Sequence, residues 1–527
     1  MSLEGARSLR KAFYHAYGEA RLPDGRSVVT GSPAGRVEAG AHVSRKATCW
    51  SVVEQADGGA GAAVHDRNFI AVALPGGGSR SAVFSAAVLF ELQRQDLLQE
   101  IDLISAVSGG SLPAALFARS CKDVADCLAL YGDQDHLLWT PAYQERIYGL
   151  LGTDFLGQAM RQMSMPWNLW RYVTSRYDRT DTLAGVFAAT IFASSSEDAE
   201  FGMTFRQLNP RRPNLLINAT NATGERLGPG LKGQHFVFSL ETFGQSLHSN
   251  LHDYPLAFAV AGSSAFPGAL YPITLAAYPD SAAGHGPYVK PLEYRHVIDG
   301  GVYDRLGGEA IRLVLSDLAE REEPCARPAG PPRSGDDEDC IDHMIAVVLD
   351  SGLPVEGEDA TRPEPRRAGM GFWLDENILR ASFALLDIQA ELRLDSLRAF
   401  AHRQNVAMRR GYGVLEDVVR IVDIRLRDLE QCVEDPLPCS RAEGLADMSA
   451  GDAAQMYREL WGQVSDVPLS LRITEESVSA LRRAARILVH RKLLAGCPRG
   501  EASFYCTPPD HSPPPVLTSF DPVGPAH

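Results

Sequence analysis

The sequence lacks long hydrophobic runs and lacks an excess of basic residues. No stretch within its 527 residues approaches the roughly 18 to 20 uninterrupted apolar residues that span a bilayer. Lysine and arginine total 51 against 66 aspartate and glutamate residues, which gives a net charge of -15. Because this charge repels polyphosphates at long range, we expect no nucleic-acid partner. We also expect no transmembrane segment.

The nine cysteines lack the spacing of a metal site, since no CxxC or clustered Cys/His pattern occurs. We therefore predict no bound metal, and we expect no cofactor. Eight cysteines form four local pairs, which favour disulfides, with free thiols as the alternative: Cys121 with Cys127, Cys325 with Cys340, Cys432 with Cys439, and Cys497 with Cys506. Cys49 is left over. Disulfides predict a periplasmic, secreted or membrane-associated protein, whereas free thiols predict a cytoplasmic one.

The composition and the N-terminal segment exclude further classes. Hydrophobic residues make up 45% and charged residues 22% of the chain, which is ordinary for a globular protein and excludes collagen-like, largely disordered and polytopic membrane chains. The start MSLEGARSLRKAF lacks the apolar core of a signal peptide, so we expect none in this chain. A native start and a start that replaced a natural leader both fit this segment.

Strand-like and helix-like runs alternate over residues 66–355. NFIAVAL is typical of a buried strand, SAVFSAAVLFELQRQ of a buried helix and IDLISAV of a second strand, which together predict a right-handed βαβ unit with parallel strands. We predict an α/β fold of three layers, with a mostly parallel central sheet flanked by helices. Helical insertions and a C-terminal helical extension complete it.

Changes in composition predict where the parts of the chain begin and end. Residues 1–65 read as an N-terminal extension and residues 66–355 as the α/β core, within which residues 320–340 form an exposed loop. Residues 356–495 read as a mainly helical part that packs on this core, and 496–527 as a Pro-rich tail. Ile378, Leu385, Ile388 and Leu392 recur at near-helical spacing in that helical part.

Residues 137–177 are predicted to form a helical insertion or lid. Aromatic and methionine side chains alternate there with basic ones, which suits an interfacial surface or an adaptable cover over an apolar substrate. An ordinary helical core is the alternative interpretation. The residues concerned are Trp139, Met160, Met163, Met165, Trp167 and Trp170.

Two glycine-rich turns follow predicted strands and precede predicted helices. The first, GGGSR, comprises Gly76, Gly77, Gly78, Ser79 and Arg80. Glycines at such a turn can present N–H groups to a developing oxyanion without side-chain obstruction. The second turn is AVSGGS, residues 106–111, and it places a serine hydroxyl at a strand-to-helix elbow.

Ser108 is the candidate nucleophile of the second turn, and Gly109 and Gly110 permit its tight bend. A serine hydroxyl needs a base within hydrogen-bond reach. The motif DGG supplies Asp299 at the end of another predicted strand, with Gly300 and Gly301 supporting the turn. Sites of α/β sheets collect at such strand ends.

In these three motifs the chain resembles the patatin-like phospholipase family. GGGSR corresponds to that family's oxyanion loop, VSGGS to its serine elbow and DGG to its aspartate motif. The resemblance implies a Ser-Asp dyad in which Ser108 attacks an ester carbonyl and Asp299 serves as general base and then general acid. It implies a serine lipid acyl hydrolase, which forms an acyl-enzyme and takes lipids or a membrane surface as substrate. Gly76, Gly77, Gly78 and Arg80 would form or anchor the oxyanion hole.

Two positions depart from the family's pattern. Ala106 stands where the simplest elbow pattern has glycine, and Arg305 stands where family members often carry asparagine. A charged Arg305 beside Asp299 would lower the pKa of that carboxylate and weaken it as a base.

Two other functions remain open from the sequence. One is a Ser-His-Asp carboxylesterase with His248, His252 or His296 as base, although His296 lies three residues before Asp299 on a strand and should face the opposite way. The other is a catalytically inactive lipid-binding protein of the same fold.

Overall fold

The computed structural model describes the following residues: 19–21, 27–29, 68–119, 139–175, 177–193, 202–209, 212–223, 235–278, 293–321, 323–324, 340–353, 376–414, 416–443, 445, 448–467, 473–494 and 504. Three of the four predicted cysteine pairs have side chains outside this description. The fourth is present, because Cys432 and Cys439 are joined by a disulfide.

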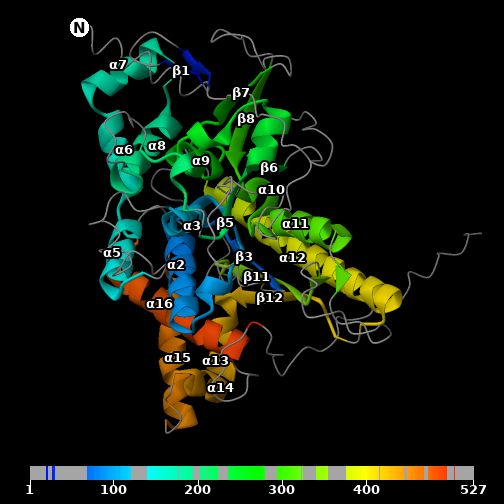
Figure 1. The fold of residues 1–527 in the computed structure, drawn as a ribbon. Coiled ribbons are helices and arrows are strands. Elements are labelled where there is room, and N and C mark those ends of the chain that lie inside the picture. The colour runs from blue at the N-terminus through cyan, green and yellow to red at the C-terminus, as the bar shows by residue number, and fades with distance from the viewer. Residues whose placement is uncertain are drawn as a thin grey trace, which may run out of the picture.

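A mostly parallel, eight-stranded sheet forms the centre of the molecule, with the strand order β12-β11-β3-β4-β5-β8-β7 and with β6 paired to β5 (Figure 1). The strands from β12 to β5 run parallel, whereas β6, β7 and β8 are paired antiparallel to their neighbours. The bounds are β3 Asn68–Leu74, β4 Leu103–Val107, β5 Asn214–Asn221, β6 His235–Phe238, β7 Ile273–Ala277, β8 Glu293–Asp299, β11 His343–Asp350 and β12 Val419–Arg425. Short strands outside it are β1 Glu19–Arg21, β2 Ser27–Val29, β9 Glu323–Pro324 and β10 Cys340–Ile341.

Helices lie on both faces of this sheet, with α2 and α16 on one side and α11 and α12 on the other (Figure 1). The longer helices are α2 Gly78–Arg94, α3 Ser111–Ala118, α5 Pro141–Leu151, α6 Phe155–Met163, α7 Pro166–Thr174, α8 Arg179–Thr190, α9 Leu256–Ser263, α11 Gly308–Arg321, α12 Glu376–Tyr412, α15 Ala450–Ser465 and α16 Glu475–Val489. Shorter ones are α10 Gly301–Asp304, α13 Gln431–Glu434 and α14 Pro436–Ala442. The predicted α/β class and three-layer arrangement are confirmed.

The predicted βαβ unit is present as β3, α2 and β4. Every residue of β3 after Asn68 is buried, and β4 is buried throughout, because helices cover both faces of these strands. Continuous apolar runs such as NFIAVAL and LISAV therefore fit central parallel strands.

The ends of β4 and β8 meet along one edge of β5. Val107, the last residue of β4, lies opposite Asn218, and Asp299, the last residue of β8, lies opposite the next residue, Ala219. Since β6 pairs with the same residues of β5, β6 takes the other edge. Because β4 is parallel and β8 antiparallel to β5, their carboxyl ends point at one another. This register places the two candidate catalytic residues together.

Helix α12 exposes the apolar positions that the sequence shows at near-helical spacing. Leu385, Ile388 and Leu392 are 66%, 58% and 65% exposed. A different set of α12 residues is buried and spaced for one helical face: Ala390, Leu394, Leu397, Phe400, Ala401 and Met408.

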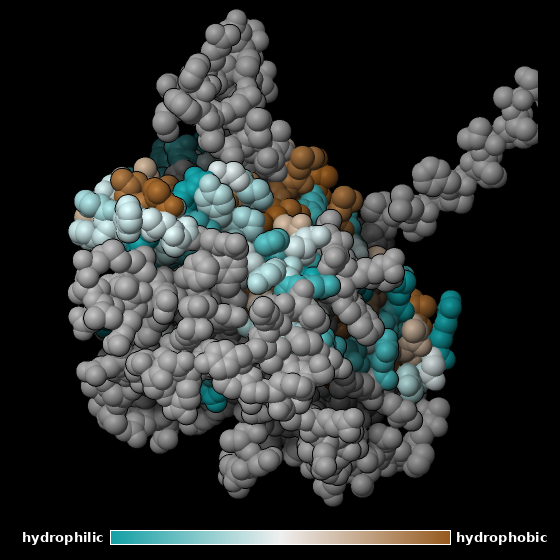
Figure 2. Space-filling model, turned by 90° about the horizontal axis from the view of Figure 1, so that it is seen from above, coloured by the Kyte–Doolittle hydropathy of each residue, from teal (hydrophilic) through white to brown (hydrophobic). Residues whose placement is uncertain are grey.

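The insertion at residues 137–177 divides into a buried start and an exposed end. Trp139 is 2% exposed and packs against Phe90 and Phe117. Trp167 and Trp170 on α7 are 64% and 56% exposed. Figure 2 shows a small hydrophobic patch among pale and hydrophilic residues at the left of this view, and a larger hydrophobic patch nearer the centre. Within the described residues, no helix is both long and apolar enough to cross a membrane.

Candidate active site

Ser108 lies at a sharp turn between β4 and α3. Its φ is 48°, a left-handed value that is uncommon outside glycine and that matches a nucleophile elbow. The following Gly109 lies against the first glycine loop, because an added Cβ would come 2.1 Å from the Gly78 carbonyl oxygen. At Gly110 the same atom would lie 2.6 Å from the Pro75 carbonyl oxygen. Neither position has room for a side chain.

Asp299 faces this serine from the end of β8. The Ser108 hydroxyl donates to Oδ2 of Asp299 at 3.1 Å, and the Gly301 N–H donates to Oδ1 at 2.7 Å. An added Cβ at Gly300 would meet the Asn218 carbonyl oxygen at 2.4 Å, so the DGG turn also requires glycine there. Burial raises the pKa of Asp299 to about 6, although these two hydrogen bonds oppose the rise.

The glycine loop lies beside the elbow and begins α2. A methyl group added at Gly76 would lie 3.3 Å from Cβ of Ser108. Gly77 and Gly78 have φ values of 142° and 62°, which glycine adopts without strain. N–H groups in the first turn of a helix have no intrahelical acceptor, and they carry the positive end of the helix dipole. This loop can therefore stabilise a negative charge near Ser108.

Two residues predicted for the oxyanion hole make other contacts. The Gly76 N–H donates to the Arg305 carbonyl oxygen at 2.8 Å, so this amide is not directed at an oxyanion. The Arg80 side chain is 6% exposed, and its Nη1 donates to the Val467 carbonyl oxygen at 3.1 Å. Burial, and the positive charge of Arg305 nearby, lower the pKa of Arg80 to about 10. The amides of Gly77 and Gly78 remain as candidate donors.

A comparison with family models matches residues 72–307 to the family described as patatin-like phospholipase. Residues 72–307 are therefore similar to the patatin-like phospholipase domain. The match begins in β3 and ends just after Arg305, so it includes all three motifs. A comparison with curated proteins finds no match.

Three solved structures are similar to parts of this chain. Human GIVD cytosolic phospholipase A2 is 14% identical with a TM-score of 0.31, and the match covers 53% of this chain and 42% of that one. This chain thus spans about two fifths of that phospholipase. VipD from Legionella pneumophila is 12% identical with a TM-score of 0.23, over 80% of this chain and 91% of that one. ExoU in its complex with SpcU from Pseudomonas aeruginosa is 14% identical with a TM-score of 0.21, over 80% and 75%.

Polar residues behind Ser108 and Asp299 were not predicted as site residues. The Ser108 N–H donates to Ser263 Oγ at 2.7 Å, and Ser263 in turn donates to the Asn218 carbonyl oxygen at 2.5 Å. Thr220 Oγ1 donates to the Asp299 carbonyl oxygen at 2.8 Å. The sequence signals were the AGSSAFPG string that contains Ser263 and the polar NATN end of β5. Neither string has a distinctive spacing.

Ser108 and Asp299 are joined to each other by a hydrogen bond that involves no histidine. His296 is exposed on β8, and its Nδ1 lies 2.9 Å from Thr274 Oγ1. His248 and His252 lie in the segment between β6 and α9, whereas the two oxygens of Asp299 accept from the Ser108 hydroxyl and the Gly301 N–H. The opposite orientation expected for His296 agrees with its exposure.

Arg305 does not pair with Asp299, contrary to the concern raised by its departure from the family pattern. Its guanidinium contacts Asp350 at 2.5 Å and also contacts Asp387. The pKa of Asp299 is accordingly raised rather than lowered. The other departure, Ala106, is fully buried within β4, where its carbonyl oxygen accepts from Asn218 Nδ2 at 2.9 Å.

Proposed function

We propose that this domain hydrolyses carboxylic esters of phospholipids or related lipids through a Ser108-Asp299 dyad. The domain match supports lipid hydrolysis in general. The observation that carries the dyad is the hydrogen bond of 3.1 Å from the Ser108 hydroxyl to the Asp299 carboxylate, at an elbow whose serine has a φ of 48°.

Asp299 acts first as general base. It removes the Ser108 proton as Oγ attacks the ester carbonyl carbon, and then gives this proton to the departing alcohol. An aspartate of ordinary pKa would be a weak base, but burial raises this pKa to about 6. The carboxylate is therefore still ionised at neutral pH and is a better proton acceptor. No histidine is required for this step.

The loop at the start of α2 stabilises the oxyanion that the attack creates. Gly77 and Gly78 supply N–H groups at a helix N-terminus, and Gly76 holds the loop next to Ser108. Water then attacks the acyl-enzyme, with Asp299 as base again, and releases the fatty acid. Arg80 holds α2 to Val467 and does not contact the reacting atoms.

Labelling with a fluorophosphonate probe tests this mechanism directly. We expect a covalent adduct on Ser108 in the folded protein and no adduct in Ser108→Ala. Lipid product profiling of the wild type against Ser108→Ala then gives the substrate class. A folded wild type that neither labels nor releases fatty acid would favour the lipid-binding protein, and labelling that depends on His296 would favour the triad.

We further propose that α6 and α7 contact the lipid surface. Seven large hydrophobic side chains on and between these helices are at least 40% exposed: Leu156, Met160, Met165, Trp167, Leu169, Trp170 and Val173. Residues 155–175 contain two arginines and no acidic residue, although the whole chain has a net charge of -15. Exposed tryptophans beside basic residues favour an interface with anionic lipid.

We propose an extracytoplasmic location, supported by the disulfide between Cys432 and Cys439. Both cysteines are fully buried. Peptide mapping without reduction should recover these two cysteines as one linked species. Recovery of both as alkylated thiols from freshly blocked cells would contradict the proposal.

A further inference from the structure

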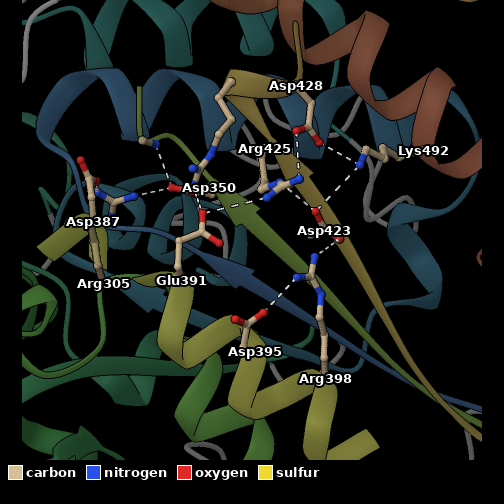
Figure 3. Close-up of polar contacts among 12 residues, drawn as sticks. Arg305, Asp350, Asp387, Glu391, Asp395, Arg398, Asp423, Arg425, Asp428 and Lys492 are labelled. Atoms are coloured by element: carbon tan, nitrogen blue, oxygen red, sulfur yellow. Dashed lines mark hydrogen bonds and ion pairs between the residues drawn. The ribbon is translucent and has the colours of Figure 1, made fainter. Parts of the chain in front are cut away.

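A cluster of charged residues lies behind the glycine loop and takes no part in the proposed chemistry. Arg305 contacts Asp350 from the end of β11 at 2.5 Å and contacts Asp387 from α12, as Figure 3 shows. We call these three residues the Arg305 cluster. Asp350 is also held by Arg427 at 3.0 Å and by the Gly352 N–H at 2.8 Å. The cluster thus joins three distant parts of the chain.

The Arg305 cluster is connected to the glycine loop through both backbone groups of Gly76. The Arg305 carbonyl oxygen accepts from the Gly76 N–H at 2.8 Å. Ser351, which follows Asp350, donates its hydroxyl to the Gly76 carbonyl oxygen at 3.4 Å. Because Gly76 also lies against Ser108, a shift of Arg305 would change the distance between the loop and the nucleophile.

Helix α12 holds the turn after Asp299 at a second point. Gln389 Nε2 donates to the Tyr303 carbonyl oxygen, and the Arg393 guanidinium lies 4.3 Å from the centroid of the Tyr303 ring. Together with Asp387, these residues hold Tyr303 and Arg305 from one helix. The backbone N–H of Tyr303 also donates to Thr220 Oγ1 at 3.1 Å.

Two of the three residues in the Arg305 cluster are buried. Arg305 and Asp350 are 9% and 2% exposed, whereas the Asp387 side chain is 35% exposed. Burial opposes ionisation of Asp350, but Arg305, the Gly352 N–H and Arg427 outweigh it and lower the pKa of Asp350. A buried ion pair contributes little net stability compared with well-packed hydrophobic residues. Its geometry, however, fixes the main chain of Arg305, which is the part that reaches the loop.

We propose that Arg305 is a positioning residue for the oxyanion loop. Asp350 and Asp387 hold its guanidinium, and its main-chain carbonyl holds Gly76 so that the amides of Gly77 and Gly78 face the carbonyl oxygen of the ester that Ser108 attacks. This inference rests on the proposed function. On this proposal α12 contributes to the active site, although α12 lies outside the matched residues 72–307.

Asp387→Asn tests the proposal, with Asp395→Asn as its control. Both residues lie on α12, but Asp395 is 68% exposed at its side chain and pairs with Arg398, away from Arg305. On a soluble short-chain ester we expect Asp387→Asn to lower kcat roughly 10- to 100-fold with KM unchanged. The acid limb of its pH profile should not move, since Arg305 does not contact Asp299. Asp395→Asn should match the wild type.

Hydrogen exchange at the Gly76 amide supplies a readout that does not depend on turnover. Loss of the Asp387 contact should speed exchange at Gly76, and the control should not. Unchanged exchange, a fall in kcat without faster exchange, or faster exchange with unchanged kcat would each overturn the proposal. Faster exchange in a protein whose wild type hydrolyses no ester would instead keep the positioning role and reject the proposed function.

Discussion

Asp299 and Asp350 are two buried carboxylates at the ends of two strands of one sheet, and their pKa values move in opposite directions. They are 7% and 2% exposed. Asp299 accepts from one hydroxyl and one N–H, and burial raises its pKa to about 6. Asp350 is buried as well, but two guanidinium groups contact it, and its pKa falls below the ordinary value.

The difference shows that burial alone does not decide what a carboxylate can do. A buried carboxylate with neutral donors keeps a high proton affinity, which suits a general base. A buried carboxylate with cationic partners stays ionised and cannot exchange protons near neutral pH, which suits an anchor. Arg305 was expected to lower the pKa of Asp299 and so weaken it as a base. Instead, the Arg305 guanidinium forms ion pairs with Asp350 and Asp387.

The largest expected effect is the loss of activity on replacing Asp299. Asp299→Asn should lower kcat on a soluble ester about 1,000-fold or more, because the base and the later acid are lost together. Stopped assays with purified variant give the rate. The free energy of unfolding at pH 8 should not fall, because the ionised, buried carboxylate is removed. A variant with wild-type kcat would remove Asp299 from the mechanism.

Asp350→Asn should lower the free energy of unfolding, whereas Asp299→Asn should not. Asp350→Asn leaves Arg305 and Arg427 without their shared carboxylate, and breaking a buried ion pair typically costs about 3 to 5 kcal/mol. Denaturant unfolding at pH 7 measures the loss. The contribution of Asp350 to stability should be present above the unfolded-state pKa of 3.8 and vanish as pH falls through its lower folded-state value. Equal free energies of unfolding for Asp350→Asn and Asp299→Asn would show that the two carboxylates do not differ in their contribution to stability.

The pH dependence should distinguish the two carboxylates next. Because Asp299 must be ionised to act as base, kcat/KM should rise with pH and level off above an apparent pKa of about 6. Below it, activity should fall about tenfold per pH unit. Stability should change with pH in the opposite direction to activity. Because the folded-state pKa of Asp299 is raised, its contribution to the free energy of unfolding should decrease as pH rises from about 4 to about 6. An acid limb near the ordinary aspartate value would refute the burial argument.

The smallest expected effect concerns the exposed helices and not the buried carboxylates. Replacing Trp167 and Trp170 by alanine should weaken binding to anionic vesicles about 10-fold, since about 1.4 kcal/mol of apolar burial corresponds to that factor. Activity on a soluble ester should not change. Leu437→Ala is the matched control, because this residue is 45% exposed on α14. Equal binding of all three proteins in a sedimentation assay would show that α7 does not contact the lipid surface.

Much of the fold could be predicted from local patterns, and so could the two residues of the proposed dyad. The buried strands, the glycine turns and the elbow at Ser108 each leave a signature within a few residues. The role of Ser263 could not be predicted, because one hydroxyl in AGSSAFPG looks like any small helical residue. The apolar positions of α12 were visible, but periodicity does not show which of two helical faces meets the core. Leu385 and Ile388 are exposed while Leu394 and Leu397 are buried. The predicted domain bounds remain predictions.

The sequence by itself determined the chemistry available at the site: a serine, a carboxylate and glycines with room for close backbone approach. Only the tertiary structure decided how they meet. Asp299 was expected at the carboxyl edge of the sheet, but β8 runs antiparallel to β5. Ser108 and Asp299 meet because β4 and β8 end opposite adjacent residues of β5. The partners of Arg305 were likewise decided by the fold, since Asp350 and Asp387 are distant in sequence. Local patterns follow from backbone geometry within a turn, whereas these contacts depend on strand register and on where α12 packs.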